Sequence, residues 1–241
     1  MKIIIIIFLI SCITSFSKLR QSYEYSNRFS YALGLKTNLI ADRGHPARIP
    51  LRESGGGGLR LMQSGLEAKS TIYLDKDSRY RIPIVIDYVR WKSTETITFS
   101  DVALQFKNQV NVVTFSSGFH YAFAYFYNSN AWIYSGLEFT GNYFHNSQYR
   151  YREIDNLDNS SVFEINREPK NNIWRFGTNL RLGMEAELEK RLMINFSLNL
   201  HIVNLIGRDD NVGQLLVVST LDKKEDFLPL FNISLMLQYR I

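Results

Sequence analysis

Apolar and polar residues alternate at every second position along much of this chain, which is the pattern of β-strands with one apolar and one polar face. Residues 29–40 and 191–206 show it most clearly, and a helical period appears nowhere at length. We therefore predict an all-β protein with eight strands, at residues 29–40, 59–74, 79–91, 110–126, 131–144, 173–186, 191–206 and 227–241.

The connections between these segments alternate between short and long. Three are short, with the sequences DKDS, NSN and ELEK, and the other four cover residues 41–58, 92–109, 145–172 and 207–226. Strict alternation places all long loops at one end of an up-and-down antiparallel sheet. This is the layout of a transmembrane β-barrel with short periplasmic turns and long extracellular loops.

The polar face distinguishes a membrane barrel from an exported soluble barrel or sandwich, which is the alternative. A solvated face is usually rich in Lys and Glu, whereas here the polar positions hold mostly small, uncharged residues that fit a confined interior. They include Ser30, Gly34, Asn38, Thr140, Asn142, Gly177, Asn179, Gly183, Ser197 and Asn199. The apolar faces run for five or six positions, about the 9–11 residues of a membrane-crossing strand.

Aromatic residues fall near both predicted ends of the strands, as two interfacial girdles would. Tyr31, Tyr80, Tyr125 and Tyr239 are near the predicted periplasmic end, and Tyr88 and Trp174 are near the other end.

The N-terminus has the features of an export signal. Lys2 is followed by an apolar run, and Ser15 and Ser17 are small residues at the two positions that a signal peptidase reads. We predict a signal peptide at 1–17, a short periplasmic segment at 18–28 and the barrel at 29–241. A lipobox ending at Cys12 is the alternative. Cys12 is the only cysteine, so cleavage after Ser17 would leave no thiol for a disulfide or a zinc site.

Composition narrows the function classes. The formal net charge is +5, and 45% of residues are hydrophobic, as in one β domain of ordinary polarity. The basic residues form no stripe and match no nucleic-acid-binding motif, so we expect no nucleic-acid partner.

Charged residues at predicted inward positions carry both signs. The acids are Glu67, Asp87, Glu138 and Glu185, and the bases include Lys36, Lys69, Arg81, Arg175, Arg181 and Arg240. The interior of an eight-stranded barrel is about wide enough for side chains to fill. We therefore predict a charged plug that supports the wall, with a narrow solute path as the alternative.

No cluster points to catalysis, a cofactor or a metal. The SGGGG sequence at 54–58 lacks the Lys and Ser/Thr of a phosphate-binding loop. The four histidines show no metal-ligand spacing. His120 and His201 fall at inward positions, where we expect hydrogen-bonded lumen residues.

Taken together, the signal peptide, the eight alternating strands and the terminal sequence Leu237-Gln238-Tyr239-Arg240-Ile241 resemble small outer-membrane β-barrel proteins of Gram-negative bacteria. The sequence LKTNL at 35–39 is similar to barrel proteins of Bacteroidetes-type bacteria. The resemblance implies location in the outer membrane, contact with outer-membrane lipids, and recognition of the last strand by the barrel-assembly machinery. That family usually ends in an aromatic residue, whereas here Ile241 is last and Tyr239 supplies the aromatic.

Three functions are compatible with this sequence. The first is a non-enzymatic barrel whose surface loops serve envelope structure or surface interaction with an unknown extracellular ligand. The second is a small channel or transporter for a hydrophilic or amphipathic solute. The third is an enzyme acting on lipid or peptide, for which the sequence offers no catalytic constellation.

Overall fold

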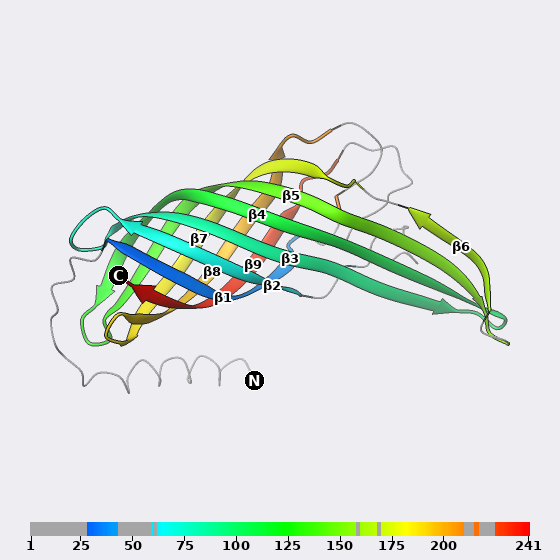
Figure 1. The fold of residues 1–241 in the computed structure, drawn as a ribbon, viewed down its shortest axis with the longest axis horizontal. Coiled ribbons are helices and arrows are strands. Elements are labelled where there is room, and N and C mark those ends of the chain that lie inside the picture. Colours follow the sequence, from blue (N-terminus) through cyan, green and yellow to red (C-terminus); the bar gives the residue numbers. More distant parts are fainter. Residues whose placement is uncertain are drawn as a thin grey trace.

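The computed structural model describes residues 28–42, 59, 62–157, 160–167, 170–209, 215–216 and 225–241. The predicted signal peptide, the lipobox and the Gly-rich sequence at 54–58 lie outside these residues. Within the described part, nine antiparallel strands follow one another (Figure 1): β1 (Phe29–Ile40), β2 (Gln63–Tyr73), β3 (Tyr80–Thr98), β4 (Val102–Phe126), β5 (Ala131–Asp155), β6 (Ser161–Arg167), β7 (Ile173–Glu189), β8 (Leu192–Ile206) and β9 (Pro229–Arg240). No helix among the described residues is long and apolar enough to cross a membrane.

Eight of these strands form a closed ring. The sheet order is β4-β3-β2-β1-β9-β8-β7-β5-β6, and a further β4–β5 pairing closes it. The last strand pairs with the first from Ser30 opposite Arg240 to Ile40 opposite Leu230. The predicted up-and-down, eight-stranded antiparallel barrel is therefore confirmed. The ninth strand, β6, was not predicted and pairs with the far part of β5.

The three short connections lie at one end of the ring. The turns after β2 and β4 fall where the sequence predicts them, and their residues Ser78 and Asn130 have φ angles of 58° and 43°. A short polar side chain tolerates this left-handed conformation better than a bulky one. The third turn was predicted at ELEK, residues 187–190, and this position is wrong. Strand β7 continues to Glu189, and the turn falls at Lys190 and Arg191.

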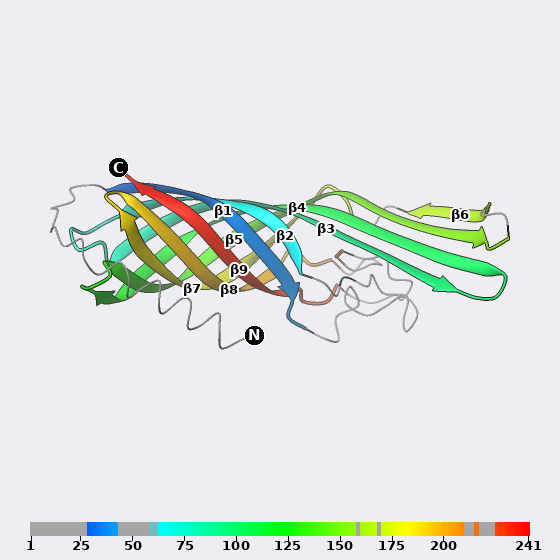
Figure 2. The same ribbon diagram turned by 90° about the horizontal axis from the view of Figure 1, so that it is seen from below.

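Two of the four predicted long loops are largely strand. Residues 92–98 continue β3, residues 102–109 begin β4, residues 145–155 continue β5, and β6 occupies 161–167. We call residues 90–98, 102–109, 148–155 and 161–167 the outer sheet. Figure 2 shows it projecting from the ring along the long axis, with β6 at the far end. Most of the other two predicted loops, 41–58 and 207–226, lies outside the described residues.

Burial in the ring is the reverse of that in a water-soluble protein. Leu33, Leu35 and Phe139 on the exterior are 66%, 64% and 71% exposed. Inward-facing Glu67 and Asn195 are both 0% exposed. Alternation along each strand produces this arrangement, because successive side chains point to opposite faces. The small polar residues predicted for the interior are buried, including Ser30, Asn38, Thr140, Asn142, Asn179, Ser197 and Asn199.

Glycines on the inner wall make room for aromatic rings. A Cβ added to Gly183 would lie 2.3 Å from Cζ of Tyr134, and one added to Gly136 would lie 2.0 Å from Cδ2 of His120. Both distances are far below van der Waals contact. The two rings therefore occupy the space beside these glycines, and they stack on each other with their centroids 5.1 Å apart.

Candidate functional site

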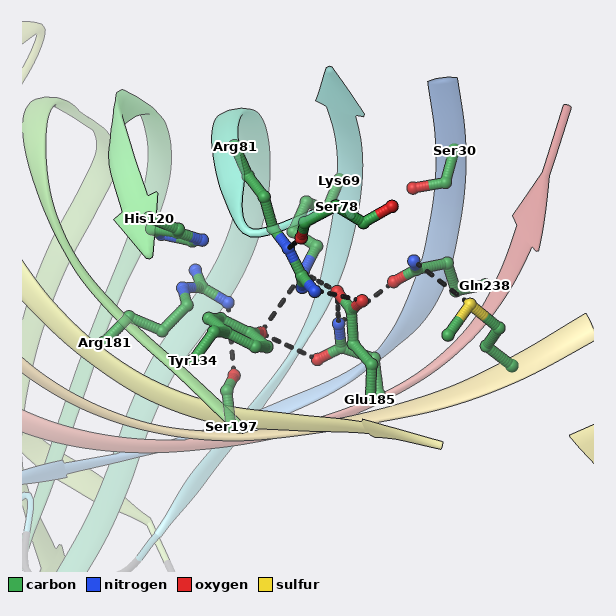
Figure 3. Close-up of polar contacts among 12 residues, drawn as sticks. Ser30, Lys69, Ser78, Arg81, His120, Tyr134, Arg181, Glu185, Ser197 and Gln238 are labelled. Carbon is green, nitrogen blue, oxygen red and sulfur yellow. Dashed lines mark hydrogen bonds and ion pairs between the residues drawn. The ribbon is translucent and has the colours of Figure 1, made fainter. Parts of the chain in front are cut away.

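Polar side chains fill the lumen in three layers. The first layer lies near the short turns (Figure 3). Arg81 from β3 pairs with Glu185 from β7 at 2.7 Å, and Lys69 from β2 lies 3.7 Å from the same carboxylate. The Tyr134 hydroxyl, on β5, accepts a hydrogen bond from Lys69 at 3.3 Å and donates one to Asn195 at 3.0 Å. Five strands, β2, β3, β5, β7 and β8, are therefore joined across the interior.

Arg181 organises the second layer. Its guanidinium contacts Glu67 and Glu138, each at 2.7 Å, and its side chain is 1% exposed. Glu67 also accepts a hydrogen bond from Ser234 at 2.7 Å. Glu138 lies 2.8 Å from His120 Nε2. One cation thus compensates two buried carboxylates, and hydroxyl and ring groups satisfy the remaining oxygens.

The third layer contains Lys36 and Asp87, whose charged groups are 2.6 Å apart. His201 Nε2 lies 3.0 Å from the Thr140 hydroxyl. Nearby, the Asn199 amide makes no hydrogen bond with any described residue. His120 and His201 are therefore hydrogen-bonded lumen residues, as predicted.

The charged plug predicted from sequence is confirmed. All ten predicted inward charges are buried, at 0–5% exposure. Eight of them form ion pairs with one another. A ninth, Arg175, pairs with Asp209 and Glu225, which are outside the predicted set. The remaining base, Arg240, donates to Ser78 Oγ at 2.7 Å and lies over the Tyr73 ring at 4.0 Å.

An apolar layer above the plug was not predicted. Its buried residues are Ile40, Leu59, Val89, Trp91, Val110, Val112, Phe144, Val203, Leu215, Leu216, Leu228 and Leu230. The cavity between this layer and the Lys36–Asp87 pair has a volume of about 10 Å³, room for about one water molecule. Val89 and Trp91 at inward positions of β3 were the sequence signal for this layer. The lumen is therefore filled by a polar plug of three layers with an apolar layer above it.

Charged residues at the outer rim tie three strands together. Arg175 on β7 lies 2.8 Å from Glu225 and 2.9 Å from Asp209, which flank β9 and β8. Lys170 also contacts both acids. Burial acts to raise the pKa of Glu225, but hydrogen bonds from Arg175, Asn204 and Lys170 hold that pKa below its ordinary value. The cluster therefore carries paired charges at neutral pH.

The structure brings together Ser116, His120 and Glu138, a set of residue types that can form a catalytic triad. However, Ser116 and His120 both bind the Glu138 carboxylate, at 2.9 and 2.8 Å. The carboxylate therefore lies between the hydroxyl and the ring, whereas a triad places the ring in the middle. All three residues are buried in the plug. No group of metal-binding side chains was found among the described residues.

Aromatic side chains surround the exterior at two levels. Near the short turns, Tyr31 and Tyr239 are 55% and 48% exposed, and the Tyr80 and Tyr121 rings are 5.3 Å apart. At the other level, the Trp174 ring lies 5.1 Å from Tyr143 and 6.2 Å from Phe115. The predicted girdle residues all lie on the outside of the barrel.

Hydrogen bonds hold together the two turns at the tip of the outer sheet. The Asn156 side chain donates hydrogen bonds to the carbonyl oxygens of Phe99 and Ser100, at 2.8 and 3.3 Å. Its backbone N–H donates to the Asp101 carbonyl at 2.9 Å. The turn between β3 and β4 is therefore fixed to the turn after β5.

No protein-family model and no curated protein matches this chain. Among solved structures, the chain is similar to Ail, the attachment invasion locus protein of Yersinia pestis, with 10% identity, a TM-score of 0.42, and coverage of 90% of this chain and 100% of Ail. A structure of Ail with the heparin analogue sucrose octasulfate gives 12% identity and a TM-score of 0.45, with coverage of 90% and 100%. Neisserial surface protein A gives 10% identity and a TM-score of 0.47, with coverage of 88% and 97%.

Proposed function

We propose that this chain is a non-enzymatic outer-membrane β-barrel protein of a Gram-negative bacterium, serving envelope structure or surface interaction. The observation that carries this proposal is the reversed burial of a closed ring. In hydrocarbon every backbone polar group must be paired within the protein, which a closed barrel achieves. Large exposed side chains such as Leu33 and Phe139 then face lipid. The export signal at 1–17, the segment at 18–28 and a Bacteroidetes-type source remain predictions.

The filled lumen weighs against the channel alternative. A solute path through the barrel would have to cross the Arg181 layer and the apolar layer that contains Trp91. Both residues are almost fully buried, at 1% and 2% exposure. We therefore expect no conductance steps from the purified protein in a planar lipid bilayer, under conditions in which a general porin conducts. Regular, ion-selective steps would favour the channel.

The outer sheet is the part that we assign to surface interaction. It consists of hydrogen-bonded strands that continue out of the ring, so it extends outward without a separate linker. The opposite end of the barrel carries only tight turns at the connections that the structure describes. The outer sheet should therefore face the exterior of the cell.

Single cysteines test this orientation, because the mature chain is predicted to have no thiol. Thr96→Cys on the outer sheet should react with a membrane-impermeant maleimide on intact cells. The matched variant Lys76→Cys, in the turn after β2, should react only after lysis. Fractionation should recover both variants in the outer membrane as heat-modifiable bands. Labelling of Lys76→Cys alone on intact cells would reverse the orientation, and a fully soluble protein would refute the proposal.

A further inference from the structure

Charges on the outer sheet are separated by sign between its two faces. Cross-strand register places Thr94, Lys107, Arg150 and Asn166 in one row, and Glu95, Phe106, Tyr151 and Ile165 in the next row on the opposite face. The face that continues the barrel exterior, which we call the outward face, carries Arg90, Lys92, Lys107, Arg150 and Arg152, with Glu164 as its acid. Among the described side chains, the acids Glu95, Glu153 and Asp155 occupy the other face.

The basic residues begin where the apolar belt ends. Tyr88 is a residue of the upper aromatic girdle and is 40% exposed. Arg90 and Lys92 follow it on the same face of β3, with Lys92 about 13 Å further along the strand at a rise of roughly 3.3 Å per residue. Aromatic girdles mark the membrane–water interface. If the chain spans the outer membrane as proposed, these cations lie level with lipid head groups.

Most of these cations have little internal compensation. Lys92 and Lys107 are exposed and form no ion pair with a described acid. Glu164 lies between two guanidinium groups, 3.4 Å from Arg150 and 3.0 Å from Arg152. The outward face therefore has more positive charges than acids to balance them.

A groove of about 500 Å³ opens where the ring passes into the outer sheet. Two cations, Lys107 and Arg150, line it together with the amides of Gln109, Gln148 and Asn166. The register of β4 against β5 shifts at this point, between Gln109 and Asn111. Cations bind phosphate oxygens, and amides can donate to and accept from sugar hydroxyls. The lining therefore suits a sugar that carries phosphate.

We propose that the outward face binds the phosphorylated sugar head group of an anionic glycolipid in the surrounding outer leaflet. The ligand is assigned to the membrane because five of the seven residues that line the groove, all except Asn108 and Tyr149, lie on the face that continues the lipid-facing surface. Lys92, Lys107 and Arg150 would contact phosphates, and the amides would contact the sugar. This inference rests on the proposed membrane location.

Binding can be measured with the full mature protein in zwitterionic micelles titrated with diphosphorylated lipid A. The test variant combines Lys92→Gln, Lys107→Gln and Arg150→Gln. The control combines Arg28→Gln, Lys76→Gln and Arg79→Gln, which removes the same charge at the opposite end of the barrel. A basic residue near an anionic lipid surface strengthens binding several-fold. The test variant should therefore bind at least about tenfold more weakly than wild type, and the control should match wild type.

Other lipids and salts identify the ligand. Lipid A without its phosphates should bind wild type as weakly as the test variant does, and inorganic phosphate at millimolar concentration should not compete. Equal lipid A affinity of wild type and test variant would overturn the proposal, as would undiminished binding of the dephosphorylated lipid. Tight binding of a soluble sulfated polysaccharide, with no preference for lipid A, would assign the face to another ligand. Fractionation of the same cells separates these outcomes from failure of the membrane location.

Discussion

Replacing Arg181 with Met should strongly destabilise the barrel, because this residue is the shared cation of two buried acids. Its guanidinium lies 2.7 Å from both Glu67 and Glu138. Without it, Glu67 would keep a hydrogen bond from Ser234, and Glu138 would keep those from Asn179 and Ser116. Removing one partner of a buried pair costs about 3–5 kcal/mol, and Glu67 is left the less compensated of the two.

Reversible unfolding in urea from lipid vesicles measures this effect. For small proteins, stability falls by roughly 1–3 kcal/mol per molar urea. A loss of 3 kcal/mol or more should therefore lower the urea midpoint by at least about 1 M. Arg181→Lys is a useful comparison, because it keeps the charge but cannot reach both carboxylates with the same forked geometry. It should fall between wild type and Arg181→Met.

A triple variant tests whether mutual compensation is the cause. Arg181→Met combined with Glu67→Gln and Glu138→Gln removes the cation and both anions together. Replacing a whole buried ionic group is often close to neutral, so the triple variant should recover much of the stability that Arg181→Met loses. If the triple variant were as unstable as the single one, or if Arg181→Met cost less than about 1 kcal/mol, the reasoning about the plug would be wrong.

Three further experiments test the wall, the closing strand and the rim. Leu198→Arg places a charge on the lipid-facing side of β8 and should cost about 2–4 kcal/mol in vesicle folding assays, whereas Asn199→Ser should change little because the Asn199 amide makes no hydrogen bond with a described residue. Tyr239→Ser with Ile241→Ser should leave export intact but prevent assembly, giving a protease-sensitive periplasmic protein, and normal amounts of heat-modifiable protein in the outer membrane would contradict this. The pKa of Glu225 is held below its ordinary value, so its stabilising contribution is present above the unfolded pKa of about 4.3 and is lost as pH falls through the lower folded value. Glu225→Gln should therefore lower the melting temperature relative to wild type at pH 7, with the gap closing below about pH 4, and a constant gap would contradict the ionic role.

The ring could be predicted from sequence because two environments act on every strand. Lipid outside and a confined interior force a regular alternation, which is why β1 was predicted at its observed bounds, residues 29–40. The same alternation predicts which charged residues face the lumen, because it places residues such as Glu67 at inward positions. Their individual partners did not follow, because pairing depends on register and side-chain reach across the barrel.

The outer sheet was missed because it lies beyond that apolar belt. Thr94, Thr96 and Thr98 alternate with Ser93 and Glu95, so the outer part of β3 has no clear apolar face. The hydrogen bonds of a long hairpin hold it as strand instead. One signal was available in β6, where Phe163 and Ile165 alternate with Glu164 and Asn166. The segment is short and isolated from the barrel pattern, so its alternation alone does not predict a strand.

The pairing of β1 with β9 has a consequence for how fast the molecule can fold. Thr37 and Ile233 lie opposite each other although they are 196 residues apart in sequence. Contacts between distant residues cost loop-closure entropy before they contribute stability, so proteins rich in them fold slowly. Hairpins such as β7–β8 can form early because their residues are close in sequence. Closure of β1 on β9 should come last, so the final intermediate is an open sheet with two unpaired edges whose lifetime sets the risk of aggregation.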